Sequence, residues 1–149
     1  MELLTDRIKE DMKASMKGGE KARLGVVRLI LSAIKQVEVD ERIVLDDERT
    51  ILVLDKMLKQ RRESIRLFAE ADRQDLIAIE EAEISVIQDF LPQALTDQEV
   101  DDMVAAAVVE SGAESIKDMG KVMALLKAPM QGRADMSLVS AKIKTALAG

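Results

Sequence analysis

The apolar residues of this chain recur three and four positions apart along nearly its whole length, and this spacing most strongly limits how it can fold. Such spacing lines one face of an α-helix, whereas a half-buried strand needs strict alternation, which is hard to find here. Only two prolines interrupt the 149 residues. We therefore expect an all-α protein, in which residues 42–45 alone stay open as an extended link or strand.

A larger helical lobe is predicted over residues 1–91. Two glycines after Lys17 end its first helix, because glycine readily follows a helix C-terminus. Two aspartates at 46–47 begin the third helix, where carboxylates accept hydrogen bonds from free backbone N–H groups. Pro92 closes the lobe, because proline lacks an N–H and disfavours helix in the residue before it. The four helices are expected at about residues 2–17, 20–37, 46–71 and 73–90, with the last two paired antiparallel.

A small three-helix lobe is predicted over residues 96–149. Its first helix begins with a capping box, in which Thr96 caps and the glutamate three residues later reaches back. Ser115 offers a cap of the same kind for the second helix, which we expect to end before Pro129. Asp135 can cap the last helix. Helices this short do not persist alone, so their mutual packing must hold the lobe together.

The residue types that are missing exclude most catalytic chemistry. The chain has no cysteine and no histidine, which removes thiolate chemistry, the commonest general base and the commonest transition-metal ligand. Any metal site would have to be all-oxygen, and no Asp-x-Asp-x-Asp-Gly spacing argues for one. With no Trp or Tyr and two Phe, stacking of bases on aromatic side chains is ruled out. We expect no catalytic residues, no cofactor and no metal.

The hydropathy and charge of the chain indicate its cellular location and its class of partner. No run approaches the roughly 20 apolar residues that cross a bilayer, and the first residues lack a basic region followed by an apolar stretch. We therefore expect a cytoplasmic protein with no membrane partner. The net charge of −6 argues against a generic nucleic-acid binder, so the distribution of charge decides more than its sum.

The charges of the small lobe are segregated along the sequence. Residues 97–114 contain six acids and no base, whereas residues 117–149 contain six bases against two acids, a balance of +4. A locally basic surface can bind phosphates although the whole chain is acidic. Attraction between helices of opposite sign explains the same pattern, and both interpretations stay open.

Gly120 lies inside a predicted helix, where glycine costs roughly 1 kcal/mol relative to alanine. Close approach of another backbone, either of this chain or of a ligand, would explain it.

A second group of charges lies in the third predicted helix and the turn after it. At about 100° per residue they form one strip, which is either an anion-facing edge or a solvated face with pairs four residues apart. The strip consists of Lys59, Arg62, Arg66 and Arg73.

Glu80 and Glu83 share a helix face with no second pair opposite, and we interpret them as solvated surface.

Several of these segments together resemble the stand-alone YqeY proteins. The similarity covers essentially the whole chain, in order. It is carried by Lys56-x-x-Lys59-Gln60-Arg61-Arg62-Glu63-Ser64-Ile65, Arg73-x-Asp75-Leu76, Glu80-x-x-Glu83-Ile84, Phe90-Leu91-Pro92, Met119-Gly120-Lys121-Val122-Met123 and Gly132-Arg133-Ala134-Asp135.

The pattern is also similar to the C-terminal tail of GatB, a subunit of the glutamine-dependent tRNA amidotransferase. The resemblance implies an all-helical fold with a three-helix lobe that helps to hold tRNA, while amide transfer occurs in parts this chain lacks. Asp135-Met136 departs from the Asn-Pro that is commoner in the tail. The residues expected to contact RNA are Lys117, Lys121, Arg133, Lys142 and Lys144, with Gly120 and Gly132 matching the tail's glycines.

We therefore expect a non-catalytic, tRNA-binding or tRNA-associated accessory module. One alternative is a helical adaptor for a translation-related protein partner. Another is a carbon–nitrogen ligase activity with glutamine as amide donor, which rests on family association alone.

Overall fold

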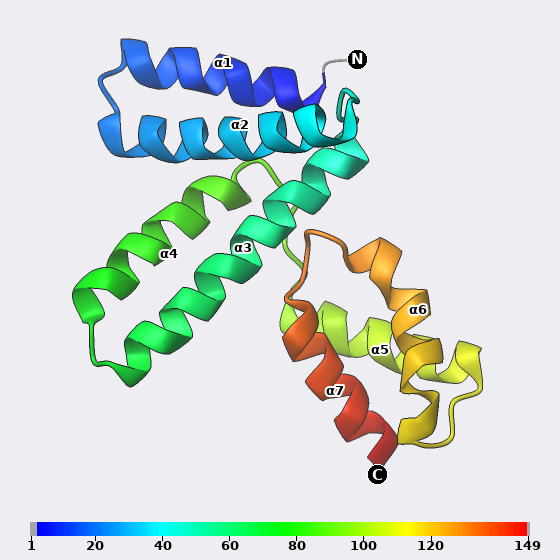
Figure 1. Cartoon of the computed structure of the whole chain (residues 1–149). Helices are drawn as coiled ribbons and strands as arrows, with labels where there is room; N and C mark the ends of the chain where they lie inside the picture. Colours follow the sequence, from blue (N-terminus) through cyan, green and yellow to red (C-terminus); the bar gives the residue numbers. More distant parts are fainter. Residues whose placement is uncertain (1–2, 149) are drawn as a thin grey trace. The chain divides into compact units, whose positions relative to one another are not determined.

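The computed structural model describes residues 3–148, and within that span it contains no strand (Figure 1). The all-α prediction is therefore confirmed, and residues 42–45 form a link between two helices. The elements in chain order are α1 (Leu4–Lys17), α2 (Lys21–Glu41), α3 (Asp47–Glu70), α4 (Gln74–Gln88), α5 (Asp97–Ser111), the 3₁₀ turn η1 (Ile116–Asp118), α6 (Met119–Met130) and α7 (Met136–Ala148).

The chain divides into two compact units. Unit 1 ends at Leu91 and holds α1 to α4, and unit 2 begins at Pro92 and holds α5, η1, α6 and α7. Each unit has its own cluster of buried apolar side chains.

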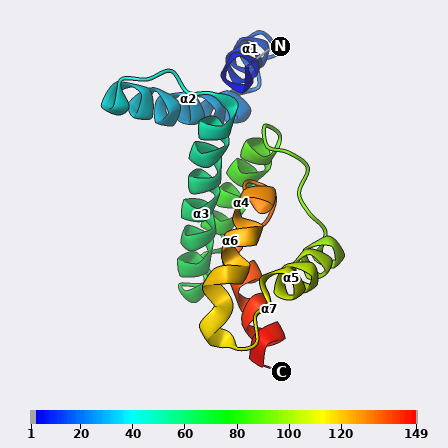
Figure 2. The ribbon, with the colours of Figure 1, turned by 90° about the vertical axis from the view of Figure 1, so that its right-hand side faces the viewer.

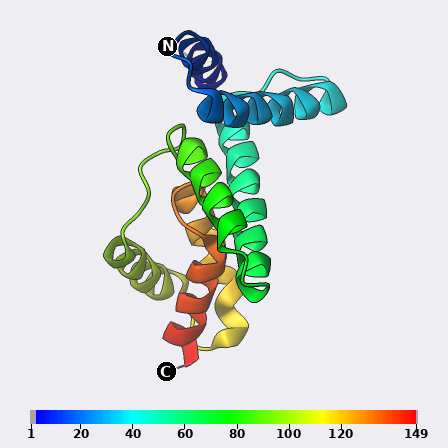
Figure 3. The same ribbon diagram turned by 90° about the vertical axis from the view of Figure 1, so that its left-hand side faces the viewer.

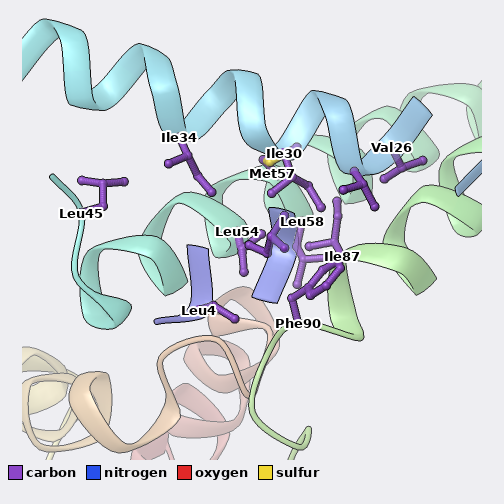
Figure 4. Packing of buried hydrophobic residues seen from close by; sticks show 12 residues of the cluster. Leu4, Val26, Ile30, Ile34, Leu45, Leu54, Met57, Leu58, Ile87 and Phe90 are labelled. Atoms are coloured by element: carbon purple, nitrogen blue, oxygen red, sulfur yellow. The ribbon is translucent and has the colours of Figure 1, made fainter. Parts of the chain in front are cut away.

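Unit 1 consists of two helical hairpins. Helices α1 and α2 run antiparallel, and α3 and α4 form a second antiparallel pair, as expected (Figure 1). Figure 2 shows α3 running crosswise to α2, so the two hairpins meet where their apolar faces cross. Ile30 of α2, Leu54 of α3 and Ile87 of α4 are completely buried at this crossing (Figure 4). Burying such a side chain contributes roughly 1.5–3 kcal/mol.

The end of α2 differs from the prediction. The helix continues four residues past the predicted end, to Glu41, and stops because Arg42 adopts a left-handed conformation with φ 56°. The Glu38 carboxylate accepts a hydrogen bond from the backbone N–H of Leu45 at 3.0 Å. This bond holds the link against the last turn of α2.

Two caps in the chain follow the predicted chemistry. Asp46 accepts a hydrogen bond from the N–H of Arg49 at 2.8 Å and so begins α3. Asp135 accepts from the N–H of Ser137 at 3.0 Å, in the first turn of α7. Both bonds satisfy N–H groups that have no partner within the helix.

Helix α6 departs from the prediction at both ends. The Ser115 side chain makes no capping hydrogen bond, because η1 stands between it and α6, and the Asp118 carboxylate accepts from the N–H of Glu114 instead. Pro129 lies inside the last turn of α6 rather than beyond it. A proline there costs one hydrogen bond near the end of the helix, and Met130 beyond it is completely buried.

Unit 2 is a three-helix bundle with a core of its own. Helices α6 and α7 run antiparallel and side by side in Figures 2 and 3. Their inward stripes repeat every four residues, which is the spacing of one face of a helix. The core includes Val104, Val122, Leu126, Met130, Val139 and Ile143.

Candidate nucleic-acid interface

The acidic half of unit 2 is α5, whose start is built by a capping box. The Thr96 hydroxyl accepts from the N–H of Glu99, and the Glu99 carboxylate accepts from the N–H of Thr96, both at 3.1 Å. The helix ends at Gly112, whose φ of 69° is left-handed. The acids of α5 are all exposed, whereas Val100, Val104 and Ala107 on the other side of the helix are buried.

Lys142 is the predicted RNA contact that the acidic helix neutralises. Its Nζ lies 2.6 Å from Oδ1 of Asp101. The hydrogen bond to Asp101 and the nearby charge of Asp97 raise the pKa of Lys142 above its ordinary value. This pair supports the second interpretation of the charge pattern, attraction between helices, at this one position.

Lys144 lies on the other side of α7. Lys142 and Lys144 stand about 100° on either side of Ile143, which is completely buried. Because Lys142 faces α5, Lys144 faces away from α5, and it is exposed. The two lysines do not share one face.

Arg133 has a structural role that sequence reasoning did not find. Its Nε donates to the backbone carbonyl of Gln93 at 3.0 Å, and its own carbonyl accepts from the N–H of Leu95 at 2.9 Å. Arg133 thus ties the turn after α6 to the segment that leads into α5. The buried Gly132 before it has φ 73°, a conformation that only glycine adopts without strain.

The start of α6 presents two exposed cations among those predicted. Lys117 in η1 is exposed, and the Lys121 side chain is 69% exposed, with a long 3.7 Å ion pair to Asp118. Gly120 lies between them in the first turn of α6. No heavy atom lies within 4 Å of where a Cβ on Gly120 would stand, so close approach of this chain's own backbone was the wrong explanation for that glycine.

The second basic strip carries ion pairs with neighbouring acids. Arg66 binds Glu63 and Glu70, and the Lys59 Nζ lies 3.6 Å from Asp55. The remaining two members are Arg62, which is half-buried, and Arg73, which binds Asp75. A solvated face predicts that Lys59 pairs with Glu63 and Arg66 with Glu70. The second pair forms, whereas Lys59 binds Asp55.

Glu80 and Glu83 were wrongly interpreted as solvated. Arg61 of α3 lies 3.4 Å from Glu83 of α4, and the two side chains are only 13% and 19% exposed. Burial, together with the negative charge of Glu83, raises the pKa of Glu80, and the Arg61 charge offsets part of the effect. The signal that could have found this cluster is the antiparallel register of α3 and α4.

The described part of the chain offers no group of three acids, histidines or cysteines that could hold a metal ion. Across residues 3–148 no helix is both long and apolar enough to cross a membrane. The molecule is thus an all-helical two-unit protein whose candidate site consists of surface cations.

Comparison with known sequences assigns this chain to a family. The sequence pattern of the family described as Yqey-like protein matches residues 5–147. The chain belongs to this family.

Curated relatives from fungi are similar over most of the chain. Altered inheritance of mitochondria protein 41 of Lachancea thermotolerans is 32% identical over 143 residues, which cover 91% of this chain and 76% of the relative. The protein of the same name from Pyrenophora tritici-repentis is 29% identical, with 93% and 77% covered. Both relatives are named as mitochondrial, so the cytoplasmic location expected for this chain stays a prediction.

Proposed function

We propose that the chain is a non-catalytic accessory module associated with tRNA, and that unit 2 contacts the RNA backbone through Lys117, Lys121 and Lys144. These three lysines are exposed and lie on η1, the first turn of α6 and the edge of α7 that faces away from α5. Lys142 and Arg133 already bind groups of this protein, so we assign them lesser roles in RNA contact.

The observation that carries the proposal is the number of basic side chains in this segment that remain exposed. Of the six bases in residues 117–149, the four lysines at 117, 121, 127 and 144 are exposed. When exposed lysines bind phosphates, the nucleic acid releases its condensed counterions, and this release is the main source of nonspecific affinity for nucleic acids. Kinship with the amidotransferase tail, which would make tRNA the RNA in question, stays part of the proposal.

The test is an electrophoretic shift of total tRNA by the full chain. Binding at about 0.05 M salt should weaken steeply as salt rises. The double variant Lys121→Glu/Lys144→Glu should lose at least about tenfold in affinity and flatten the salt dependence. The matched control is Lys13→Glu/Lys35→Glu, which makes the same charge change at exposed positions of unit 1. Absence of a shift at low salt, or equal losses in the two double variants, would contradict the proposal.

A protein–protein adaptor is the second candidate function, and the cleft described below favours it. An amide-transfer activity has only family association behind it, and glutamine-dependent release of ammonia by the purified chain would be its test.

A further inference from the structure

Unit 2 has a cleft of about 420 Å³ between α5 and α7, which the proposed RNA contacts Lys117, Lys121 and Lys144 do not line. Its walls are Val104 and Ala105 on one helix and Ala141, Thr145 and Ala146 on the other. Short side chains on both walls leave room for another element to approach the two helices closely. Lys142 and Asp101 also line the cleft and join the two helices through a 2.6 Å ion pair.

Exposed apolar side chains extend the cleft on both walls. Leu138 is 61% exposed and lies three and seven residues before Ala141 and Thr145, so it stands on the same face of α7. Val109 is 82% exposed and lies four residues after Ala105, where it continues the outer wall on α5. These are the most exposed large apolar side chains that the structure describes in unit 2.

The charge around the cleft is negative. Asp97 lies close enough to Lys142 to raise its pKa, so two acids, Asp97 and Asp101, lie near this one base. The α5 wall of the cleft carries no base, because residues 97–114 contain none. An acidic polymer such as RNA is therefore repelled from this side, and a basic partner is attracted.

We propose that the cleft between α5 and α7 binds a short amphipathic helix of a partner protein, with small apolar side chains on one face and Lys or Arg beside them. The helix lays its apolar face on the exposed Ala105 and Ala141, and its bases meet Asp97 and the free edge of the Asp101 carboxylate. This is the helix-in-groove mode of recognition. From Asp97 to Val109, α5 is roughly 18 Å long, which matches a partner helix of about 12 residues.

The test uses three labelled peptides of about 14 residues, which differ only in the residues beside a common Leu/Ala face. These residues are Lys, Gln or Glu. Binding to the full chain is measured by fluorescence anisotropy at about 0.15 M salt, and the site is mapped by backbone amide shifts of the isotopically labelled protein. The Lys peptide should saturate, with shifts confined to residues 97–109 and 138–146, and the Glu peptide should bind at least about tenfold more weakly.

Filling the cleft at constant net charge separates this site from general attraction to an acidic protein. Ala105→Gln/Ala141→Gln should reduce affinity for the Lys peptide at least about tenfold. Ala106→Gln, at an exposed position of α5 outside the cleft, should leave it unchanged. All three alanines are exposed, so the variants should fold, as unchanged melting temperatures will verify.

Several results would overturn the inference. They are no saturable binding of the Lys peptide, equal binding of the Glu peptide, and equal affinity after the cleft is filled. A dimer that dissociates when the cleft is filled would make a second copy of this chain the occupant instead. If tRNA displaces the Lys peptide, and Ala105→Gln/Ala141→Gln abolishes tRNA binding, the RNA site lies in this cleft instead. Loss of tRNA binding in the lysine variants tests the proposed function separately.

Discussion

Arg23 of α2 binds the carboxylate of Asp11 in α1 through both arms of its fork, with Nε–Oδ1 and Nη2–Oδ2 distances of 2.9 Å. Its Nη1 also donates to Asp89, just after α4, at 2.7 Å. The guanidinium carbon lies 5.6 Å from the centroid of the Phe90 ring. One side chain thus joins three helices of unit 1, and only a planar guanidinium can make both paired bonds at once.

Replacing Arg23 with lysine should lower the free energy of unfolding by about 1–2 kcal/mol, because lysine cannot reproduce the two-pronged bond. Urea denaturation measures the loss. The control is Arg66→Lys, at an exposed arginine that binds neighbours on its own helix, which should cost much less because exposed ion pairs contribute little to stability. Equal costs would show that the bridge between helices contributes nothing beyond a surface pair.

The same pair should make stability depend on pH. Arg23 lowers the pKa of Asp11 below that of an ordinary aspartate. The contribution is therefore fully present above the ordinary pKa of about 4 and is lost as pH falls below it. The stability difference between the wild type and Arg23→Lys should shrink between about pH 4 and pH 2. A difference that grows in acid would contradict the assignment.

Gly120→Ala should stabilise the protein by about 0.5–1 kcal/mol, because alanine favours the helix and the added Cβ meets no heavy atom within 4 Å. Thermal denaturation measures the gain. If an RNA backbone approaches Gly120, the same variant should bind tRNA more weakly although it is more stable. A variant less stable than the wild type would show that the start of α6 is packed more tightly than the structure indicates.

Gly132→Ala should have the opposite effect and cost about 1–2 kcal/mol. With φ at 73°, the backbone of Gly132 is left-handed, which strains any residue that has a Cβ. The matched control is Gly25→Ala, at an exposed helical position where a Cβ meets nothing within 4 Å. The control should be neutral or stabilising, and a Gly132→Ala protein as stable as the control would refute the conformational argument.

Glu80→Gln should stabilise the protein at neutral pH. Because the pKa of Glu80 is raised in the folded state, folding favours the protonated form, and stability falls as pH rises through the range above about 4.5. Glutamine removes this penalty, so the gain should be largest at pH 7 and vanish in acid, where Glu80 is protonated. Urea titrations at both pH values test it, and a gain that persists in acid would exclude ionisation as the cause.

The successes and errors of sequence reasoning follow the range of the interactions involved. Thr96 and Asp135 were recognised as caps because each bonds N–H groups only two or three residues away. The end of α2 was missed because Arg42, without the usual glycine, adopts the left-handed conformation. Ser115 was wrongly taken as a cap because its pattern also suits the 3₁₀ turn that follows it.

The sequence by itself determined that this chain is helical, where most of its helices begin and end, and that acids and bases are segregated in residues 97–149. These properties depend on neighbours within a few positions, whose spacing can be read directly. Only the tertiary structure decided which charges remain available. Lys142 meets Asp101 across 41 positions and Arg133 meets Gln93 across 40, because helix packing sets such distances and the local pattern does not.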